Sequence, residues 1–271
     1  MYHLDATRQA GPEIQEGFLV AKETAEVRPI VAGIAILPRD LARHLRDHGN
    51  VYWRTPLADS RIARFILGRA GRGTDDFVPF DEVVGRYGDL SKDGILPEVP
   101  ATAPQDEALA KLLAAHAPDG GVGLDIGCGV GRGAFVLRAY VDQALGVDRS
   151  AARVRRARNV ATTNAAFFLP GPPDSGIREV PVDLDRLDRE GVDFLVAGSD
   201  ALPLADDIAD VVVLRAGDGR GPWPDAAAAL AEATRVARED ALFVLDASFA
   251  SDVQGMARLG EAFGLHAWRR P

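Results

Sequence analysis

The stretch that decides the fold is "VGLDIGCGVGRGAFVL", residues 122–137. A short apolar run leads into Asp125, and four glycines then fall at every second position from Gly127 to Gly133. A glycine between a strand and a helix can adopt a positive φ and lets a ligand approach the backbone. The helix that follows offers unpaired N–H groups at its N-terminus. The pattern therefore predicts a strand, a loop that holds a nucleotide-like ligand, and a helix.

The same rhythm of strands and helices continues through the rest of the chain. We expect strands at 122–127, 143–150, 192–200, 209–217, 241–248 and 265–270, and helices at 105–117, 133–140, 150–164, 224–239 and 251–264. Alternation of this kind implies right-handed βαβ units and a mostly parallel sheet, so the fold class is α/β. Ligands of such sheets bind at the carboxyl ends of the strands. Asp125, Asp148, Asp200 and Arg215 are predicted to meet along that rim.

The glycine loop fits the dinucleotide fingerprint Gly-x-Gly-x-x-Gly poorly. Counted from Gly127, the third glycine is replaced by Arg132, and counted from Gly129 it is replaced by Ala134, an allowed variant. Asp125 would lie awkwardly beside a pyrophosphate but suits a ligand that carries an ammonium group. These residues favour such a ligand and leave a nicotinamide-dependent oxidoreductase as an alternative.

The segment "LDIGCGVGRG" (124–133) resembles the first motif of the class I S-adenosylmethionine-dependent methyltransferases, Asp/Glu-x-Gly-x-Gly-x-Gly. Three more segments resemble later motifs of that family, in the family's order: "LGVDRS" (145–150), "GSDALPLADDIADVVVL" (198–214) and "ALAEATRVAREDALFVL" (229–245). The resemblance covers residues 105–250. It implies a Rossmann-like, mostly parallel sheet flanked by helices, S-adenosyl-L-methionine as cofactor and S-adenosyl-L-homocysteine as product.

The resemblance also implies which residues bind the cofactor. The acidic end of the second strand, Asp148, would hold the ribose hydroxyls, Asp200 would contact the adenine amine, and Ala201 would donate its backbone N–H to the ring. All these cofactor groups except the ring acceptor are donors, and aspartates accept. The full expected set is Asp125, Gly127, Cys128, Gly129, Gly131, Asp148, Arg149, Asp200, Ala201 and Arg215.

Two residues are candidates for a catalytic role. "FDEVVGRYGDL" (80–90) resembles a segment that lies over the cofactor in many small-molecule methyltransferases, which implies that Tyr87 lies near the sulfonium; otherwise it is a core or linker tyrosine. Asp218 lies with Trp223 in "LRAGDGRGPWPD" (214–225), after the fourth strand, where the family often places catalytic side chains; otherwise this is a solvent-exposed loop. Because Asn-Pro-Pro-Tyr is missing, amino-methylation of nucleic-acid bases or glutamine finds no support.

The resemblance thus implies methyl transfer by in-line displacement to a small-molecule or peptide acceptor. The protein would mainly orient the two reactants and exclude water. A second hypothesis is a catalytically silent protein that binds S-adenosylmethionine and acts as a partner or regulatory module. The oxidoreductase named above is the third.

The first hundred residues are expected to form a small α+β domain, because the Pro-rich segment 94–104 reads as a linker to a second domain at 101–271. Residues 1–16 read as a loop, residues 17–37 as two short strands, and residues 59–94 as a helical cap. Residues 17–41 resemble the small zinc-binding activator subunits of tRNA methyltransferases. The cysteines of that family fall on Ala21 and Thr24 here, so we expect no metal.

The composition of the chain limits which partners and which cellular compartment we expect. The net charge is −9, which argues against a nucleic-acid partner, and the basic stretch "RVRRARN" (153–159) reads as a solvated helix face. The single cysteine, Cys128, excludes a disulfide framework, and the absence of a long apolar segment predicts a cytoplasmic protein without a membrane anchor.

The end of the chain departs from the family pattern. The C-terminus looks shortened after Ser248, so one closing strand is expected to be missing or to come from the N-terminal segment or another chain. An edge left open would be a pairing site for a homodimer or a protein partner. The Pro-rich interruption at 165–191 is expected to be a substrate-side flap or a surface elaboration.

Overall fold

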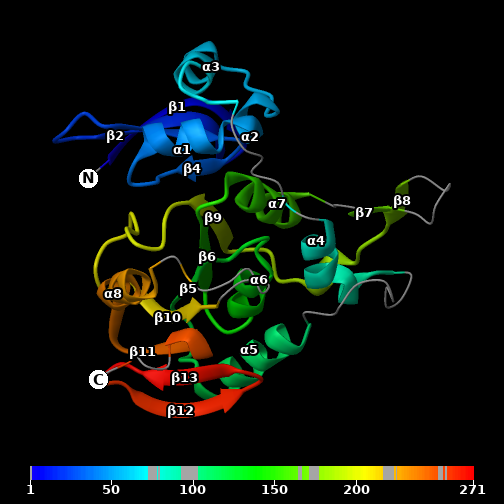
Figure 1. Cartoon of the computed structure of the whole chain (residues 1–271), viewed down its shortest axis with the longest axis vertical. Helices are drawn as coiled ribbons and strands as arrows, with labels where there is room; N and C mark the ends of the chain where they lie inside the picture. Colours follow the sequence, from blue (N-terminus) through cyan, green and yellow to red (C-terminus); the bar gives the residue numbers. More distant parts are fainter. Residues whose placement is uncertain are drawn as a thin grey trace.

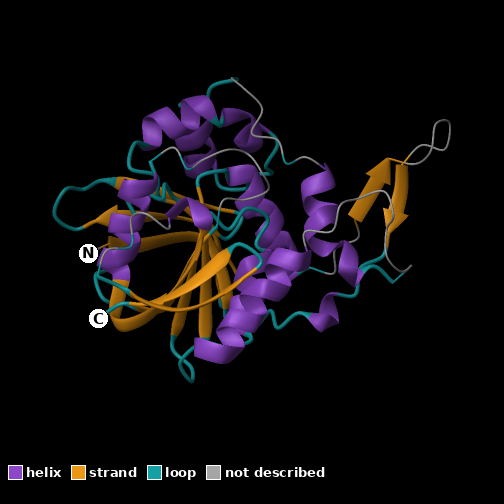
Figure 2. Ribbon diagram, turned by 60° about the horizontal axis from the view of Figure 1, so that its bottom comes forward, coloured by secondary structure: helices purple, strands orange, loops and turns teal. Residues whose placement is uncertain are grey.

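The computed structural model describes residues 2–72, 78, 80–92, 103–163, 167–170, 177–215, 223, 225–249, 253 and 255–271. Within these residues eleven strands form one sheet, in the order β1-β2-β3-β4-β9-β6-β5-β10-β11-β13-β12. The sheet runs from the N-terminal strands at the top of Figure 1 to the C-terminal hairpin at the bottom. Figure 2 shows the strands as a twisted fan with helices on both faces.

Five parallel strands form the centre of the sheet and confirm the α/β fold class. They are β9 (Val192–Val196), β6 (Gln143–Asp148), β5 (Val122–Ile126), β10 (Ala209–Leu214) and β11 (Ala237–Asp246). The connecting helices are α5 (Ala103–His116), α6 (Arg132–Arg138), α7 (Ala151–Thr162) and α8 (Ala226–Val236). Alternate strand residues enter two hydrophobic clusters, with Val213 in one and Val212 in the other, so helices cover both faces.

The N-terminal residues extend this sheet. β1 (Tyr2–Ala10) and β2 (Glu13–Ala21) form a hairpin, followed by β3 (Val27–Val31) and β4 (Ile34–Ile36), and β4 pairs in parallel with β9. The expectation of a loop over residues 1–16 is wrong. β1 is an edge strand that is exposed along most of its length, including Tyr2 and Leu4 at 40% each, so no buried apolar run marks it in the sequence.

Short helices complete the N-terminal part: α1 (Leu41–Asp47), α2 (Gly49–Trp53), α3 (Ser60–Leu67) and α4 (Phe80–Tyr87). A tight turn at Gly33, with a φ of 76°, joins β3 to β4. Ala21 ends β2, and the turn to β3 contains Thr24. The resemblance to activator subunits stays a prediction, as does the domain boundary near residue 100, because residues 93–102 lie outside the described part.

The expected helix at 251–264 and the expected missing strand are both wrong. Residues Ala257–Ala262 form β12, which pairs antiparallel with β13 (Leu265–Arg269), and β13 pairs antiparallel with β11. The misleading signal was the helix-like spacing of Met256, Leu259 and Ala262; Leu259 lies at an irregularity in the β12 register, which breaks strand alternation. Both closing strands are present, and it is the connection from β11 to β12, residues 247–256, that is short.

The interruption at 165–191 contains a second, two-stranded sheet. β7 (Phe167–Pro170) pairs antiparallel with β8 (Ile177–Val180), and the chain then bonds to the residues after α4, through Lys92 N to Pro181 O and Asp183 N to Leu90 O. The insertion therefore lies beside α4. No helix within the described ranges combines the length and the apolar character needed to cross a bilayer.

Candidate functional site

The site is built on the loop between β5 and α6. Gly127, Gly129 and Gly131 have φ values of 76°, 55° and 92°, which residues with a side chain rarely adopt. The backbone N–H groups of Gly127 and Cys128 both donate to the carbonyl of Val147 on β6, at 2.8 and 3.0 Å. The loop lies between a strand and a helix, as the sequence pattern predicts, and these two bonds anchor it to the neighbouring strand.

Asp125 precedes this loop and is almost completely buried, with 1% of its surface exposed. Its Oδ2 atom is buried, and none of the described residues donates a hydrogen bond to it. Burial raises the pKa of the Asp125 carboxyl, and the guanidinium of Arg215 opposes that shift. A buried acceptor without a donor is costly, so this carboxylate oxygen is suited to a donor from a bound ligand.

A buried charge cluster surrounds Asp125. Asp106 on α5 accepts from Arg215, which follows β10, at 2.8 Å, and from Arg86 on α4 at 3.2 Å. These three residues are 6 to 7% exposed. Together with Asp125 they hold two positive and two negative charges, so the cluster can stay ionised in the interior only as a set.

Asp148 lies at the carboxyl end of β6, next to the glycine loop. Its Oδ2 accepts from the N–H of Gly129 at 3.0 Å, and its Oδ1 accepts from the N–H of Ser150 at 2.8 Å. Ser150 in turn caps α7. Both carboxylate oxygens are thus oriented by backbone donors, and Asp148 is half-buried while Arg149 beside it is exposed.

Helix α4 lies on the glycine loop. The Tyr87 hydroxyl donates to the carbonyl of Val130 at 2.7 Å, and the Tyr87 side chain is fully buried, which raises the pKa of the phenol well above its ordinary value. Glu82 bonds to Arg153 of α7 at 2.9 Å and lies over Gly129, at 3.4 Å from where a Cβ of that glycine would be. The geometry favours a positioning contact for Tyr87 over direct contact with a ligand.

The remaining predicted residues fall into three groups. Asp200 follows β9 and is exposed, with Ala201 half-buried beside it, at the same rim as Asp148. Cys128 is buried, and burial, Asp148 and Asp125 all raise the pKa of its thiol, which keeps it neutral. Asp218 lies outside the described residues.

Trp223 closes one side of the glycine loop. A Cβ on Gly127 would come within 2.8 Å of the indole Cη2, so the ring lies directly against that glycine. The ring packs edge-on against Phe249 at 5.4 Å between centroids, and no described residue bonds to its buried Nε1. The predicted aromatic after the fourth strand therefore does reach the loop.

The arginines of α7 are not a solvated face, and that expectation is wrong. Arg153 bonds to Glu82, Arg155 bonds to Thr55 at 2.9 Å, and Arg158 pairs with Glu13 at 3.1 Å. Three parts of the N-terminal segment thus dock on one helix through arginines. Their partners lie on elements that are distant in the sequence. The sequence alone therefore does not show that these arginines are paired.

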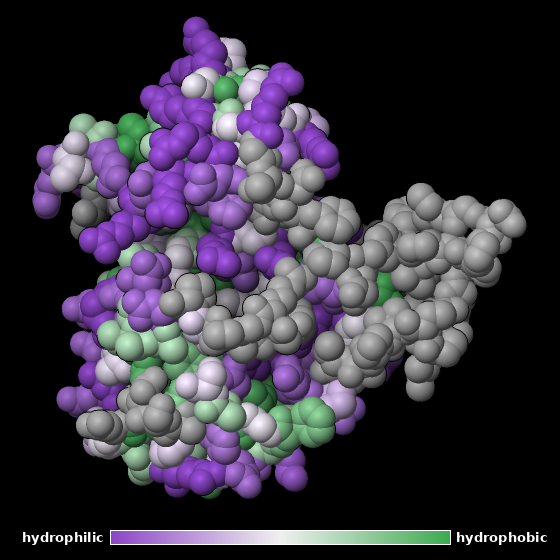
Figure 3. Space-filling view, viewed as in Figure 1, coloured by the Kyte–Doolittle hydropathy of each residue, from purple (hydrophilic) through white to green (hydrophobic). Residues whose placement is uncertain are grey.

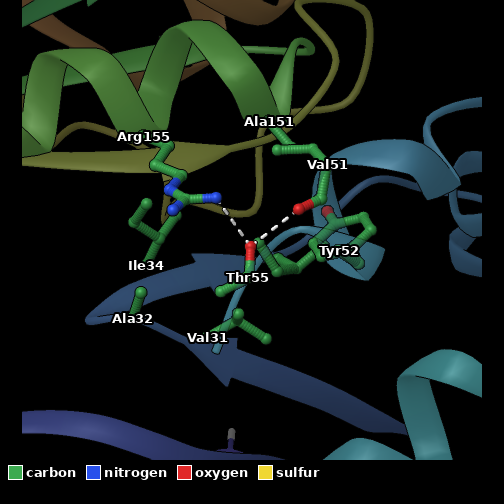
Figure 4. Close-up of a pocket in the computed structure, with 9 residues that line it drawn as sticks. Val31, Ala32, Ile34, Val51, Tyr52, Thr55, Ala151 and Arg155 are labelled. Carbon is green, nitrogen blue, oxygen red and sulfur yellow. Dashed lines mark hydrogen bonds between the residues drawn. The ribbon is translucent and has the colours of Figure 1, made fainter. Parts of the chain in front are cut away.

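A small apolar hollow lies at this contact, between β3, β4, α2 and α7 (Figure 4). Its polar groups, Arg155 and Thr55, bond to each other, and the Thr55 hydroxyl donates to the carbonyl of Val51 at 2.7 Å. The hollow is thus a packing defect between apolar residues rather than a site with groups to orient a ligand.

Four residues near the loop were missed by the sequence reasoning: Glu82, Arg86, Asp106 and Arg153. Glu82 and Arg86 could have been found, because they lie in the segment that singled out Tyr87. Asp106 and Arg153 carry no local signal, since both lie in amphipathic helices where a charge is ordinary. Among the described residues, no group of three or more His, Cys, Asp or Glu side chains could hold a metal ion.

Comparison with known proteins places the site in context. Residues 124–245 match the model of a family described as methyltransferase domain. A search of curated proteins finds no relative. Solved structures similar to the chain include the YcgJ protein of Bacillus subtilis, at 24% identity over 51% of this chain and 49% of that chain, with a TM-score of 0.39.

Two further solved structures are similar to the chain at low sequence identity and with comparable TM-scores. A proposed S-adenosyl-L-methionine-dependent methyltransferase of Methanococcus maripaludis is 13% identical over 73% of this chain and 96% of that one, with a TM-score of 0.45. A geranyl diphosphate methyltransferase in complex with SAM is 18% identical over 54% and 48%, with a TM-score of 0.40. The chain spans about half the length of YcgJ and of the geranyl diphosphate enzyme. Likeness at this level does not extend to activity or substrate.

Proposed function

We propose that the methyltransferase domain at residues 124–245 makes this chain an S-adenosyl-L-methionine-dependent methyltransferase for a small-molecule or peptide acceptor. The observation that carries the proposal is the buried, unpartnered Oδ2 of Asp125 at the start of the glycine loop. A pyrophosphate would place negative charge beside this carboxylate, whereas an α-ammonium group supplies the missing donor.

The residues present fit the proposed cofactor. Asp125 would hold the ammonium, Asp148 the ribose hydroxyls and Asp200 the adenine amine, so that each acceptor meets a donor of the ligand. Gly127 and Gly129, at positive φ, add no side chain of their own to the loop that the ligand would contact. The charge cluster of Arg86, Asp106, Arg215 and Asp125 keeps the Asp125 carboxylate in place without neutralising it through a direct hydrogen bond to Oδ2.

The reaction needs little chemistry from the protein. When bound, S-adenosyl-L-methionine supplies a methyl carbon already activated by the sulfonium. The chain's residues then have to orient the acceptor in line and exclude water, and α4 and Trp223 are placed to do so on two sides of the loop. A general base is needed only for a poorly acidic acceptor. Of the two catalytic candidates, Tyr87 has its hydroxyl already bonded to Val130, and Asp218 stays a candidate from the sequence alone.

Isothermal titration calorimetry tests the proposal. We expect binding of S-adenosyl-L-methionine and S-adenosyl-L-homocysteine but not of NAD. Asp148→Ala should lose most of that affinity while its circular dichroism spectrum stays that of the wild type. Asp119→Ala, an exposed carboxylate before the opposite end of β5, is the matched control and should bind normally. Binding of NAD alone, or unchanged affinity in Asp148→Ala, would refute the assignment.

Activity is tested separately from binding. A panel of small hydroxyl, amine, thiol and carboxylate acceptors, with short peptides, is incubated with the radiolabelled methyl donor, and transfer to at least one is expected. Binding of the donor without transfer to any member would favour the silent partner protein instead.

A further inference from the structure

The sheet ends at β12 on its C-terminal side, and within the described residues no strand lies beyond it (Figure 1). An edge strand presents unpaired N–H and C=O groups that can pair with another chain. Leu259 on β12 and Phe263 just after it are 37% and 70% exposed. Figure 3 shows more hydrophobic surface on this lower half of the molecule than on the upper half, which β1–β4 and α1–α3 form.

The charged residues of β12 would be complementary to those of a second copy of the same strand. Arg258 lies opposite Trp268 and Glu261 lies opposite His266 on β13, so both charged residues project from the same face, where they bond to each other. In an antiparallel pair related by a two-fold axis between Leu259 and Gly260, Arg258 of one copy comes opposite Glu261 of the partner subunit, and the same contact occurs a second time.

We propose that two copies of this chain pair through β12 and form a symmetric dimer with a continuous sheet. Phe263 supports a second copy of this chain as the partner of β12. It forms the two-residue turn between β12 and β13 with Gly264, at φ values of 42° and 75°. A bulky residue at positive φ is strained, and such strain persists where a function retains it. The same pairing sets Phe263 beside Met256 of the partner subunit, where its exposed ring would be covered.

The other edge of the sheet, β1, is less suited to this role. Its charges are already used within the chain, since Asp5 pairs with Arg61 at 3.2 Å and Arg8 pairs with Glu16 at 3.3 Å. Two register shifts against β2 also distort it, whereas β12 has one register shift against β13, between Arg258 and Gly260; such irregularities protect the edges of natural sheets. The charged residues of β12, Arg258 and Glu261, bond to each other and to His266 within the β12–β13 hairpin, and within the described residues no ion pair ties them to another element.

The test uses two charge reversals that are each self-repulsive. In Arg258→Glu the paired strands would oppose glutamate to glutamate, and in Glu261→Arg they would oppose arginine to arginine. Each variant alone is expected to dimerise at least roughly tenfold more weakly than the wild type, measured by analytical ultracentrifugation. An equimolar mixture should recover the dimer, because each reversed residue then meets an opposite charge on the other chain.

Misfolding of the single variants cannot produce this recovery, because the same chains are measured alone and mixed. A wild type that stays monomeric at 100 µM, single variants that dimerise as well as the wild type, or a mixture that stays monomeric would overturn the proposal.

Phe263→Asn gives an independent readout. Asparagine tolerates positive φ, so the variant should be at least as stable to heat as the wild type and yet dimerise more weakly. A stable variant with wild-type dimerisation would contradict the role of Phe263. None of these outcomes depends on the proposed methyl transfer.

Discussion

Gly133 offers the sharpest test of the buried charge cluster. It lies in the first turn of α6 and has no positive φ, so alanine would ordinarily favour the helix by up to about 1 kcal/mol. Here, however, a Cβ at this position would overlap Nη2 of Arg215 and Oδ2 of Asp125. The Arg215 head cannot simply swing away, because it bonds to the buried Asp106. We therefore expect Gly133→Ala to act against its helix propensity.

The magnitude follows from the opposing effects. Overpacking a buried site costs about 1–3 kcal/mol, and disturbing a buried ion pair adds to it, which exceeds the propensity gain. A net loss of about 1–3 kcal/mol should lower the midpoint of thermal unfolding by about 3–10 °C in a chain of this size. Gly88→Ala is the control: the nearest atom to its Cβ would be 3.6 Å away, an ordinary contact. A Gly133→Ala protein as stable as Gly88→Ala in differential scanning calorimetry would show that the cluster is not rigidly packed.

Three further substitutions probe the same region. Asp125→Asn should weaken S-adenosyl-L-methionine binding by roughly 10- to 100-fold. Because burial raises the pKa of Asp125 and only the ionised carboxylate holds an ammonium, wild-type affinity should fall on acidification at a higher pH than for an ordinary aspartate, and a flat calorimetric profile in the acid range would contradict this. Tyr87→Phe leaves a buried loop carbonyl without its donor and should cost about 1–3 kcal/mol in urea unfolding, whereas Tyr2→Phe at an exposed site should change stability by less than about 0.5 kcal/mol. Arg153→Met removes an ion-pair partner of the buried Glu82 carboxylate and should lower the thermal midpoint, while the double change with Glu82→Gln should restore most of it; a double variant no better than the single would show that the pair contributes little.

The core of the fold could be predicted from the sequence because its signals are local. The glycine spacing around Gly129 and the alternation of apolar strands with amphipathic helices each extend over a few residues. The prediction for the end of the chain was wrong for the opposite reason. Whether residues 257–262 form a helix or a strand is decided by pairing with β13, and β13 is held by β11, so the outcome depends on tertiary contacts.

The residues of the candidate site also differ in whether the sequence predicts them. Asp125 and Asp148 lie at the carboxyl ends of β5 and β6, which meet at one rim of the sheet, so their proximity follows from topology. Asp106 is different: it contacts Arg215 at a separation of 109 residues and Arg86 at 20, and nothing in helix α5 sets it apart from any other solvated aspartate. The sequence therefore reveals the groups that would touch a ligand but not the groups that hold them.

The position of α4 shows why the second kind of residue matters. Glu82, Arg86 and Tyr87 bond to α7, α5 and the glycine loop respectively, and all three are at most 8% exposed. Each partner lies on an element fixed by the core of the sheet, so three buried polar contacts with separate partners define one position for the helix. Apolar packing alone would tolerate sliding, whereas an unpaired charge at any of these contacts is costly. The helix that covers the glycine loop is thus held by the same charges that surround Asp125, and a change in either is expected to reach the other.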